Sequence, residues 1–182
     1  MNKLVLKKLA AVMALSGAAQ TVMAADGEID FVGTITANTC PIQVTDLNTS
    51  DTSGAIGLGN ASTGGLTQAG DVGGSGAFSL TIDTLDAGCS VDGKAAVLTL
   101  ISLSGTAGPS GEWIGITNEA GKAENVAVQI KDAQGNVVKL GENSAPYADP
   151  TQPMRFTANY IATGVPTAGP ANAKVAFNVD FR

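Results

Sequence analysis

The sequence predicts an all-β fold of the sandwich or barrel type, and two observations support this prediction. After residue 24, short runs of alternating apolar and polar residues are separated by turn residues, which is the pattern of half-buried strands. Helical periodicity is hard to find in the same region, where Gly, Thr, Ser, Asn, Ala and Val dominate. Short strands at regular spacing are typical of antiparallel sandwiches and barrels.

The chain up to residue 118 predicts four strands and one long connection. Residues 26–40, DGEIDFVGTITANTC, form a strand with Ile29, Phe31 and Ile35 in phase. Residues 48–76 are rich in Gly, Ser and Thr and predict an irregular connection with at most one short strand. The next strands are GAFSLTIDTL, alternating through Phe78, Leu80 and Ile82; AAVLTLIS, a continuous apolar run typical of a central strand; and the short EWIGITN.

The second half predicts a hairpin, a loop and two further strands. The hairpin is VAVQIKDAQGNVVKL, with its turn at residues 132–136. A proline-rich loop, SAPYADPTQP, leads to the strand MRFTANYIAT, in which Phe156, Ala158, Tyr160 and Ala162 are in phase. After a Gly/Pro connection, the strand AKVAFNVDFR has Ala173, Val175, Phe177, Val179 and Phe181 on one face and Lys174, Asn178, Asp180 and Arg182 on the other.

The N-terminal residues predict a secretory signal peptide, residues 1–24. A basic start with Lys3, Lys7 and Lys8 precedes an apolar run over residues 9–19, and small residues precede a cleavage site after Ala24. The run is too short to cross a hydrocarbon core of about 30 Å, so the alternative of a membrane anchor is disfavoured. About 158 of the 182 residues remain, which suits one domain.

The composition of the exported part excludes several partners and sites. Removing the three lysines from the 10 basic residues and keeping the 16 acidic residues leaves a net charge of about −9, which argues against nucleic acid and anionic lipid as partners. Outside the cytosol, the two cysteines, Cys40 and Cys89, are most simply a disulfide, whose closure is worth about 4 kcal/mol in the chain-entropy model. Two thiols without any histidine are too few for a metal site.

The sequence predicts neither an enzyme nor a cofactor. Without histidine there is no catalytic triad or imidazole base, and no Gly-rich segment has the Lys-Ser/Thr ending of a phosphate loop. The carboxylates are scattered, and Glu28 and Asp30 are expected on the exposed side of their strand. Trp113 could stack on a sugar but is more often a packing residue in such a strand, and Tyr147 is similarly ambiguous.

The informative feature is a pair of strands at opposite ends of the sequence. The segment ADGEIDFVG is extended, alternating and upstream of the cysteines, and AKVAFNVDFR has a long apolar face with no strand after it. A sandwich would need one further strand to shield that edge. We therefore expect a sandwich that lacks its final strand.

Three stretches resemble the subunits of chaperone–usher pili of the type 1-like family. FVGTITANTC resembles the family's opening, NVAVQIKDAQG an internal strand and turn, and RFTANYIATGVPTAGPANAKVAFNVDF the C-terminal signature. The resemblance covers essentially the whole exported chain. It implies an immunoglobulin-like sandwich that lacks its last strand, with a disulfide joining the first two strands. A periplasmic chaperone first lends a strand to the gap, and at the outer-membrane usher the N-terminal extension of the next subunit replaces it.

The resemblance also assigns residues to these roles. Residues 25–36 are the donor-strand extension and residues 37–182 the pilin domain. The receiving groove and chaperone-binding element is the last strand, although Phe181 stands where the family usually has Tyr. The donor residues are Ala25, Gly27, Ile29, Phe31 and Gly33, with Gly27 matching a family glycine and Ala25 filling the outermost pocket; the groove residues are Val175, Phe177, Val179, Phe181 and Arg182.

The predicted function is that of a structural shaft subunit of a surface fimbria, exported through the periplasm and supporting cell adhesion. Its predicted partners are identical or related subunits, the chaperone and the usher, with no nucleic acid and no membrane insertion. Two alternatives remain open: a secreted carbohydrate-binding β-sandwich that uses Trp113, and a small secreted hydrolase with paired carboxylates.

Overall fold

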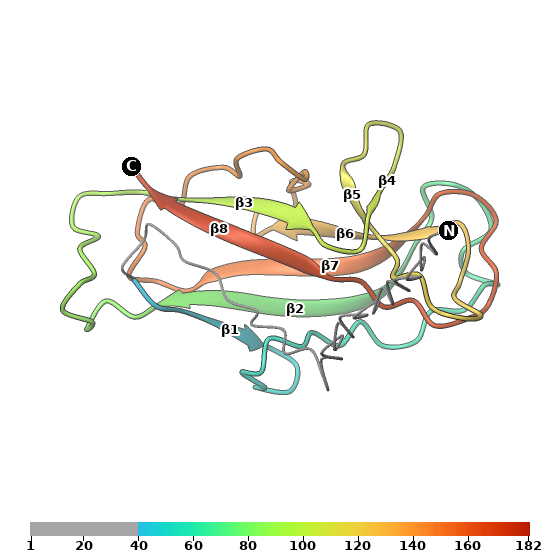
Figure 1. Cartoon of the computed structure of the whole chain (residues 1–182), viewed down its shortest axis with the longest axis horizontal. Helices are drawn as coiled ribbons and strands as arrows, with labels where there is room; N and C mark the ends of the chain where they lie inside the picture. Colours follow the sequence, from blue (N-terminus) through green and yellow to red (C-terminus); the bar gives the residue numbers. More distant parts are fainter. Residues whose placement is uncertain (1–39) are drawn as a thin grey trace, which may run out of the picture. The chain divides into compact units, whose positions relative to one another are not determined.

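The computed structural model describes residues 40–182, and within them the chain forms two β-sheets (Figure 1). The signal peptide, the first predicted strand and the donor-strand residues lie outside this range. No described helix is long and apolar enough to cross a membrane. One sheet has six strands in the order β1-β2-β7-β6-β5-β4, and the other pairs β3 with β8. The strands are β1 (Ile42–Asp46), β2 (Val72–Ile82), β3 (Ala96–Ser102), β4 (Thr106–Ala107), β5 (Trp113–Gly115), β6 (Val126–Asp132), β7 (Met154–Ala162) and β8 (Val175–Phe181).

The alternation predicted from the sequence is confirmed in the centre of the large sheet. On β2, Phe78, Leu80 and Ile82 are all buried, and Phe78 stacks on Phe156 of β7 with ring centroids 5.2 Å apart. Along β7, the side chains from Met154 to Ala158 are alternately buried and exposed. These side chains form the core between the two sheets, because a period of two directs one face of each strand inward.

The sequence predicts residues 48–76 to be an irregular connection with at most one short strand, and the structure has a strand only at the end of this stretch, where β2 begins at Val72. The first residues of β2 pair with Tyr160 and Ile161 of β7, with a register shift between Gly73 and Gly76. Their low strand propensity is overridden by tertiary pairing with an established strand. β4 is a further short strand that the sequence did not suggest.

The predicted hairpin at residues 126–140 forms its turn but not its second strand. The Asp132 carboxylate accepts hydrogen bonds from the amides of Gln134 and Asn136, which fixes the turn. The chain then touches β6 through a single bridge at Val137 and crosses to the second sheet, where Leu140 bridges to Leu100 of β3. The residues after Val137 leave β6 and pair instead with the edge of β3.

The two strands of the small sheet therefore have different surroundings. β3 pairs with β8 along one edge, and along the other edge it makes bridges with Leu140, Asn143 and Tyr147. The sequence correctly predicts β3 as a strand with neighbours on both sides. Within residues 40–182, β8 has β3 as its single strand partner (Figure 1).

A disulfide between Cys40 and Cys89 holds one end of this unit together, with their Cα atoms 4.5 Å apart. Cys40 lies two residues before the first residue of β1, and Cys89 lies in the connection after β2. The bond therefore joins the start of β1 to the β2–β3 loop, rather than joining two strands directly as the resemblance implied.

Candidate strand-binding groove

Two core-facing side chains of β8, Phe177 and Phe181, are less covered than the residues opposite them on β3. In the antiparallel register, Phe177 lies opposite Leu100 and Phe181 opposite Ala96, so each pair shares a face. Leu100 is 3% exposed and Ala96 is 0% exposed, whereas Phe177 and Phe181 are both half-buried. The sandwich is therefore closed over β3 and open along β8.

An apolar groove of about 520 Å³ runs beside β8. One wall is the start of β8, including Val175 and Phe177, together with residues 172–174 just before it. The opposite wall is Val44 of β1 with the segment that follows β1, residues 54–58. The floor is the inner face of the large sheet, to which four strands contribute: Phe78, Leu80, Ile114, Val128, Ile130 and Ala158. A groove with this lining can accept an extended segment that inserts apolar side chains.

The wall at residues 54–58 is held in place by the carboxylate of Asp46. This side chain is 2% exposed and accepts hydrogen bonds from the backbone N–H groups of Gly57 (3.0 Å), Asn48 (2.7 Å) and Thr49 (3.2 Å). These bonds, with that from Gly57 the largest cause, hold the pKa of Asp46 below its ordinary value. The ionised carboxylate thus fastens the wall to the end of β1.

The same wall lies directly on the backbone of β2. The N–H of Ser75 donates to the carbonyl oxygen of Leu58 at 2.9 Å. A Cβ atom at Gly76 would lie 2.8 Å from the carbonyl oxygen of Gly57 and 2.8 Å from Leu58 Cδ2. The glycine is needed because the two backbones approach too closely for a side chain.

The predicted groove residues of β8 occupy three different environments. Val175 and Phe177 line the groove, whereas Val179 is 1% exposed and belongs to the core. Phe181 packs partly buried against that core. The Arg182 backbone exchanges two hydrogen bonds with Ala95, and its guanidinium lies 4.0 Å from the Asp180 carboxylate at the surface. The predicted donor residues, and Glu28 and Asp30, lie outside the described residues.

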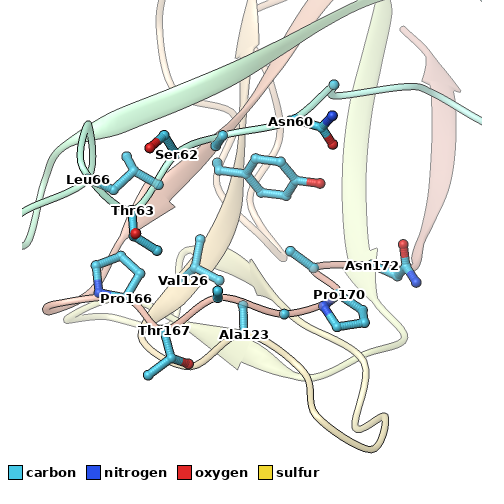
Figure 2. A pocket seen from close by; sticks show the side chains of 16 residues that line it. Asn60, Ser62, Thr63, Leu66, Ala123, Val126, Pro166, Thr167, Pro170 and Asn172 are labelled. Atoms are coloured by element: carbon cyan, nitrogen blue, oxygen red, sulfur yellow. The ribbon is translucent and has the colours of Figure 1, made fainter.

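A second hollow of about 590 Å³ adjoins the groove at Asn172, and we call it the end hollow (Figure 2). Its sides are residues 59–66, which continue the groove wall, and residues 166–172 of the β7–β8 connection. Figure 2 shows Ser62 and Thr63 on one side and Pro166, Thr167 and Pro170 on the other. No Asp, Glu, Lys or Arg side chain is among the described residues that line it.

The remaining candidates from the sequence take no part in either hollow. Trp113 is half-buried, and its ring lies so near Gly108 that a Cβ there would be 2.9 Å from Trp113 Cε3. Tyr147 packs on Phe156, and burial raises its pKa to about 12. Within the described chain, the Tyr147 hydroxyl has no hydrogen-bond partner. No group of three or more His, Cys, Asp or Glu side chains in residues 40–182 could hold a metal ion.

Sequence reasoning missed the far wall and the floor of the groove. Ile56 and Leu58 are two residues apart between glycines, which is a weak strand-like signal inside a stretch read as loop. The floor residues were expected only as core, because alternation shows which face is buried but not which part of it lacks a cover.

Comparisons with known proteins agree with this architecture. The family model described as "Fimbrial protein" matches residues 29–182. The chain is 45% identical over 69 residues to the type-1 fimbrial protein C chain of Escherichia coli, an alignment that spans 36% of this chain and only 38% of that protein. It is 30% identical over 163 residues to the type-1 fimbrial protein A chain of Escherichia coli K12, spanning 86% of this chain and 84% of that protein.

Among solved structures, the P pilus rod subunit PapA has the same fold, with a TM-score of 0.53 at 15% identity over 86% of this chain and 99% of PapA. The fold is thus the immunoglobulin-like sandwich of such subunits, and its sheets do not close within the described residues. The extent of the family match, and the relative aligned over most of its length, identify this chain as a member of the fimbrial protein family.

Proposed function

We propose that this subunit polymerises head-to-tail by donor-strand exchange, in which residues 25–33 of one copy fill the groove beside β8 of the next. The observation that carries the proposal is the open edge of β8 over an apolar groove of about 520 Å³. The subunit would reach the outer-membrane usher bound to a periplasmic chaperone, and the resulting surface fimbria would support cell adhesion.

The donor segment is long enough to pair along β8, and its pattern suits an apolar groove. Its nine residues span about 30 Å when extended, which exceeds the seven-residue β8 at about 23 Å. Ile29 and Phe31 alternate with Glu28 and Asp30, so the apolar side chains can enter the groove while the carboxylates face water. Each large side chain contributes roughly 1.5–3 kcal/mol if fully buried, and each main-chain hydrogen bond adds about 0.5–1.5 kcal/mol.

The direct test of donor-strand exchange uses variants of the donor segment that should impair polymer formation without impairing folding of the subunit. Phe31→Ala should leave the complex of subunit and chaperone intact but weaken polymer formation, because it empties one pocket of the neighbouring copy. Gly27→Leu should do the same because its side chain has no space. The readouts are the yield of chaperone complex and the ladder of polymers on unboiled denaturing gels.

The matched controls are Glu28→Ala and Asp30→Ala, which change the water-facing side of the same segment. Both should polymerise like the wild type. If Phe31→Ala lost the chaperone complex but any remaining subunit still polymerised, Phe31 would belong to its own core and the proposal would be refuted.

The chaperone is proposed to bind the last strand, since an unpaired strand edge is a template for another chain. Deleting Phe181 and Arg182 removes the two backbone hydrogen bonds to Ala95 and the contact of Phe181 with the core. The truncated subunit should be captured poorly by the chaperone and degraded in the periplasm. Normal accumulation of the truncated subunit with the chaperone would contradict this role.

A further inference from the structure

The end hollow is a second candidate binding site beside the groove, and its lining indicates what it could accept. Its lining combines small and apolar residues, including Leu66, Val126 and Pro166, with the uncharged polar residues Ser62 and Thr167. A hollow without charged groups favours an uncharged, apolar insert, because burying a charge there would leave it unpaired.

The rim of the end hollow is pre-formed. The β7–β8 connection is fastened to residues 117–125 by hydrogen bonds from the Ala123 N–H to the Pro170 carbonyl, from the Glu124 N–H to Thr167 Oγ1, and from Asn125 Nδ2 to the Val165 carbonyl, each 2.9 Å long. A site that is already ordered binds with a smaller entropic cost.

The opposite end of the same sandwich has an exposed apolar side chain. Leu85, in the β2–β3 loop, is 95% exposed, the highest value among the exposed large apolar residues of the described chain. Its own N–H donates to the Asp83 carboxylate at 3.0 Å, and the Cys89 N–H donates to the Asp86 carbonyl at 2.9 Å. Single exposed apolar residues are common, so the position of Leu85 matters more than its exposure.

Leu85 and the end hollow lie at opposite ends of β2. Leu66 precedes this strand and Leu85 follows it, and the eleven residues of β2 span roughly 36 Å at the usual rise of a strand. Leu85 shares its end with Cys40, the first described residue after the donor segment, because Cys40 is bonded to Cys89 of the same loop. Leu85, which we call the knob, therefore lies at the end of the sandwich where the donor segment joins its own domain.

The direction of the donor strand brings the Leu85 end of the donating copy close to the end hollow of the accepting copy. Every strand pair of the described sheets is antiparallel, and an antiparallel donor beside β8 leaves the groove at the Val175 end, next to the end hollow. From Gly33 to Cys40 the chain reaches about 25 Å at full extension, so the donor's own domain must lie close to that exit.

We infer that the loop carrying Leu85 of one copy inserts into the end hollow of the copy that accepts its donor strand. The partner is a second copy of this chain, and the inference rests on the proposed donor-strand exchange. The contact is heterologous, since a knob at one end meets a hollow at the other, and such contacts extend into fibres. It would fix the angle between consecutive subunits by adding a second contact to that of the donor strand.

Cross-linking in assembled fibres tests this contact. The described chain has no free cysteine, so a short bismaleimide reagent would react only with introduced thiols. In the double variant Leu85→Cys/Ser62→Cys, the two thiols of one copy lie at opposite ends of β2, so a short link can form only between copies. We expect a ladder that survives boiling. The control Ile101→Cys/Ser62→Cys, with Ile101 54% exposed on β3, should give none.

A second readout uses Leu85→Ser, which should polymerise but form fibres that separate more easily, with an equilibrium constant for association lowered about 10- to 100-fold. If wild-type fibres form, yet Leu85→Cys/Ser62→Cys does not cross-link and Leu85→Ser fibres are as stable as wild type, the knob contact is refuted while donor-strand exchange stands. If Phe31→Ala polymerises normally, the proposed function itself fails, whatever the cross-links show.

Discussion

At the scale of single residues, the ionisation state of the Asp46 carboxylate affects the hydrogen bonds that hold one wall of the groove. Its carboxylate accepts three backbone N–H groups, and the bond from Gly57 holds the wall opposite β8. Because the folded-state pKa lies below the ordinary value of 3.8, the bonds contribute to stability above that pH and are lost as the pH falls through the folded-state pKa.

Replacing Asp46 should therefore have an effect that depends on pH. Asp46→Asn should lower the melting temperature at pH 7, because an amide is a weaker acceptor than a carboxylate. The gap between wild type and variant should shrink below about pH 4, where the wild-type carboxylate is itself being protonated. Melting curves of purified fibres from pH 7 to pH 3 measure this. A gap that stayed constant over that range would show that Asp46 contributes by shape and not by charge.

Phe177 and Leu98 give a second comparison between single residues. Both face the core from the small sheet, but Leu98 is fully buried and Phe177 lies half-buried on the groove. Leu98→Ala should cost the subunit about 2–5 kcal/mol and reduce the yield of chaperone complex. Phe177→Ala should affect folding less but polymer yield more, because it removes part of the wall that meets the donor strand. Equal losses of both products in the two variants would argue against a special role for Phe177.

At the scale of elements, the groove depends on an irregular segment as much as on β8. Residues 54–58 form no strand, yet they are held between Asp46 and the backbone of β2. Their position is set by the close approach to Gly76.

Gly76→Val should push this wall away from β2, because even its Cβ atom would lie 2.8 Å from the Gly57 carbonyl oxygen. We expect lower polymer yield and a destabilisation of roughly 1–3 kcal/mol, as is typical of overpacking. Gly64→Ala is the matched control, since a Cβ there meets Ser62 Oγ at an ordinary 3.5 Å. Polymer and melting temperature unchanged in Gly76→Val would show that the wall is free to shift.

At the scale of the whole molecule, the disulfide connects the groove to the end that carries Leu85. It fastens the start of β1, whose Val44 lines the groove, to the β2–β3 loop. Forty-nine positions separate the two cysteines, so opening the bond releases a long loop in the unfolded chain.

The double variant Cys40→Ser/Cys89→Ser should lose about 4 kcal/mol of stability in the chain-entropy model. Because small secreted domains tolerate such losses poorly, we expect less subunit in the periplasm, measured as the yield of chaperone complex. Reducing the wild-type protein should reproduce the loss, whereas the double variant should not respond to reductant. An undiminished yield of the double variant would show that the sheets hold this end together without the bond.

Much of this architecture can be predicted from the sequence, because it depends on local patterns. The alternation of Phe78, Leu80 and Ile82 determines which face of β2 is buried, whereas on β8 the alternation leads to a single fully buried residue, Val179. The need of an apolar face for a neighbour then indicates an uncovered edge. These inferences hold because the period of a strand is a property of its own residues.

Tertiary structure decided where that edge is open and what surrounds it. The arm after Val137 leaves β6 to cover β3, so within the small sheet it is β8, and not β3, that keeps an unpaired edge. The groove wall at Ile56 and Leu58, the start of β2 at Val72, and the separation of Leu85 from the end hollow all depend on contacts between residues far apart in the chain. Local periodicity cannot predict such contacts, because it indicates which side of a strand is buried but not which neighbour buries it.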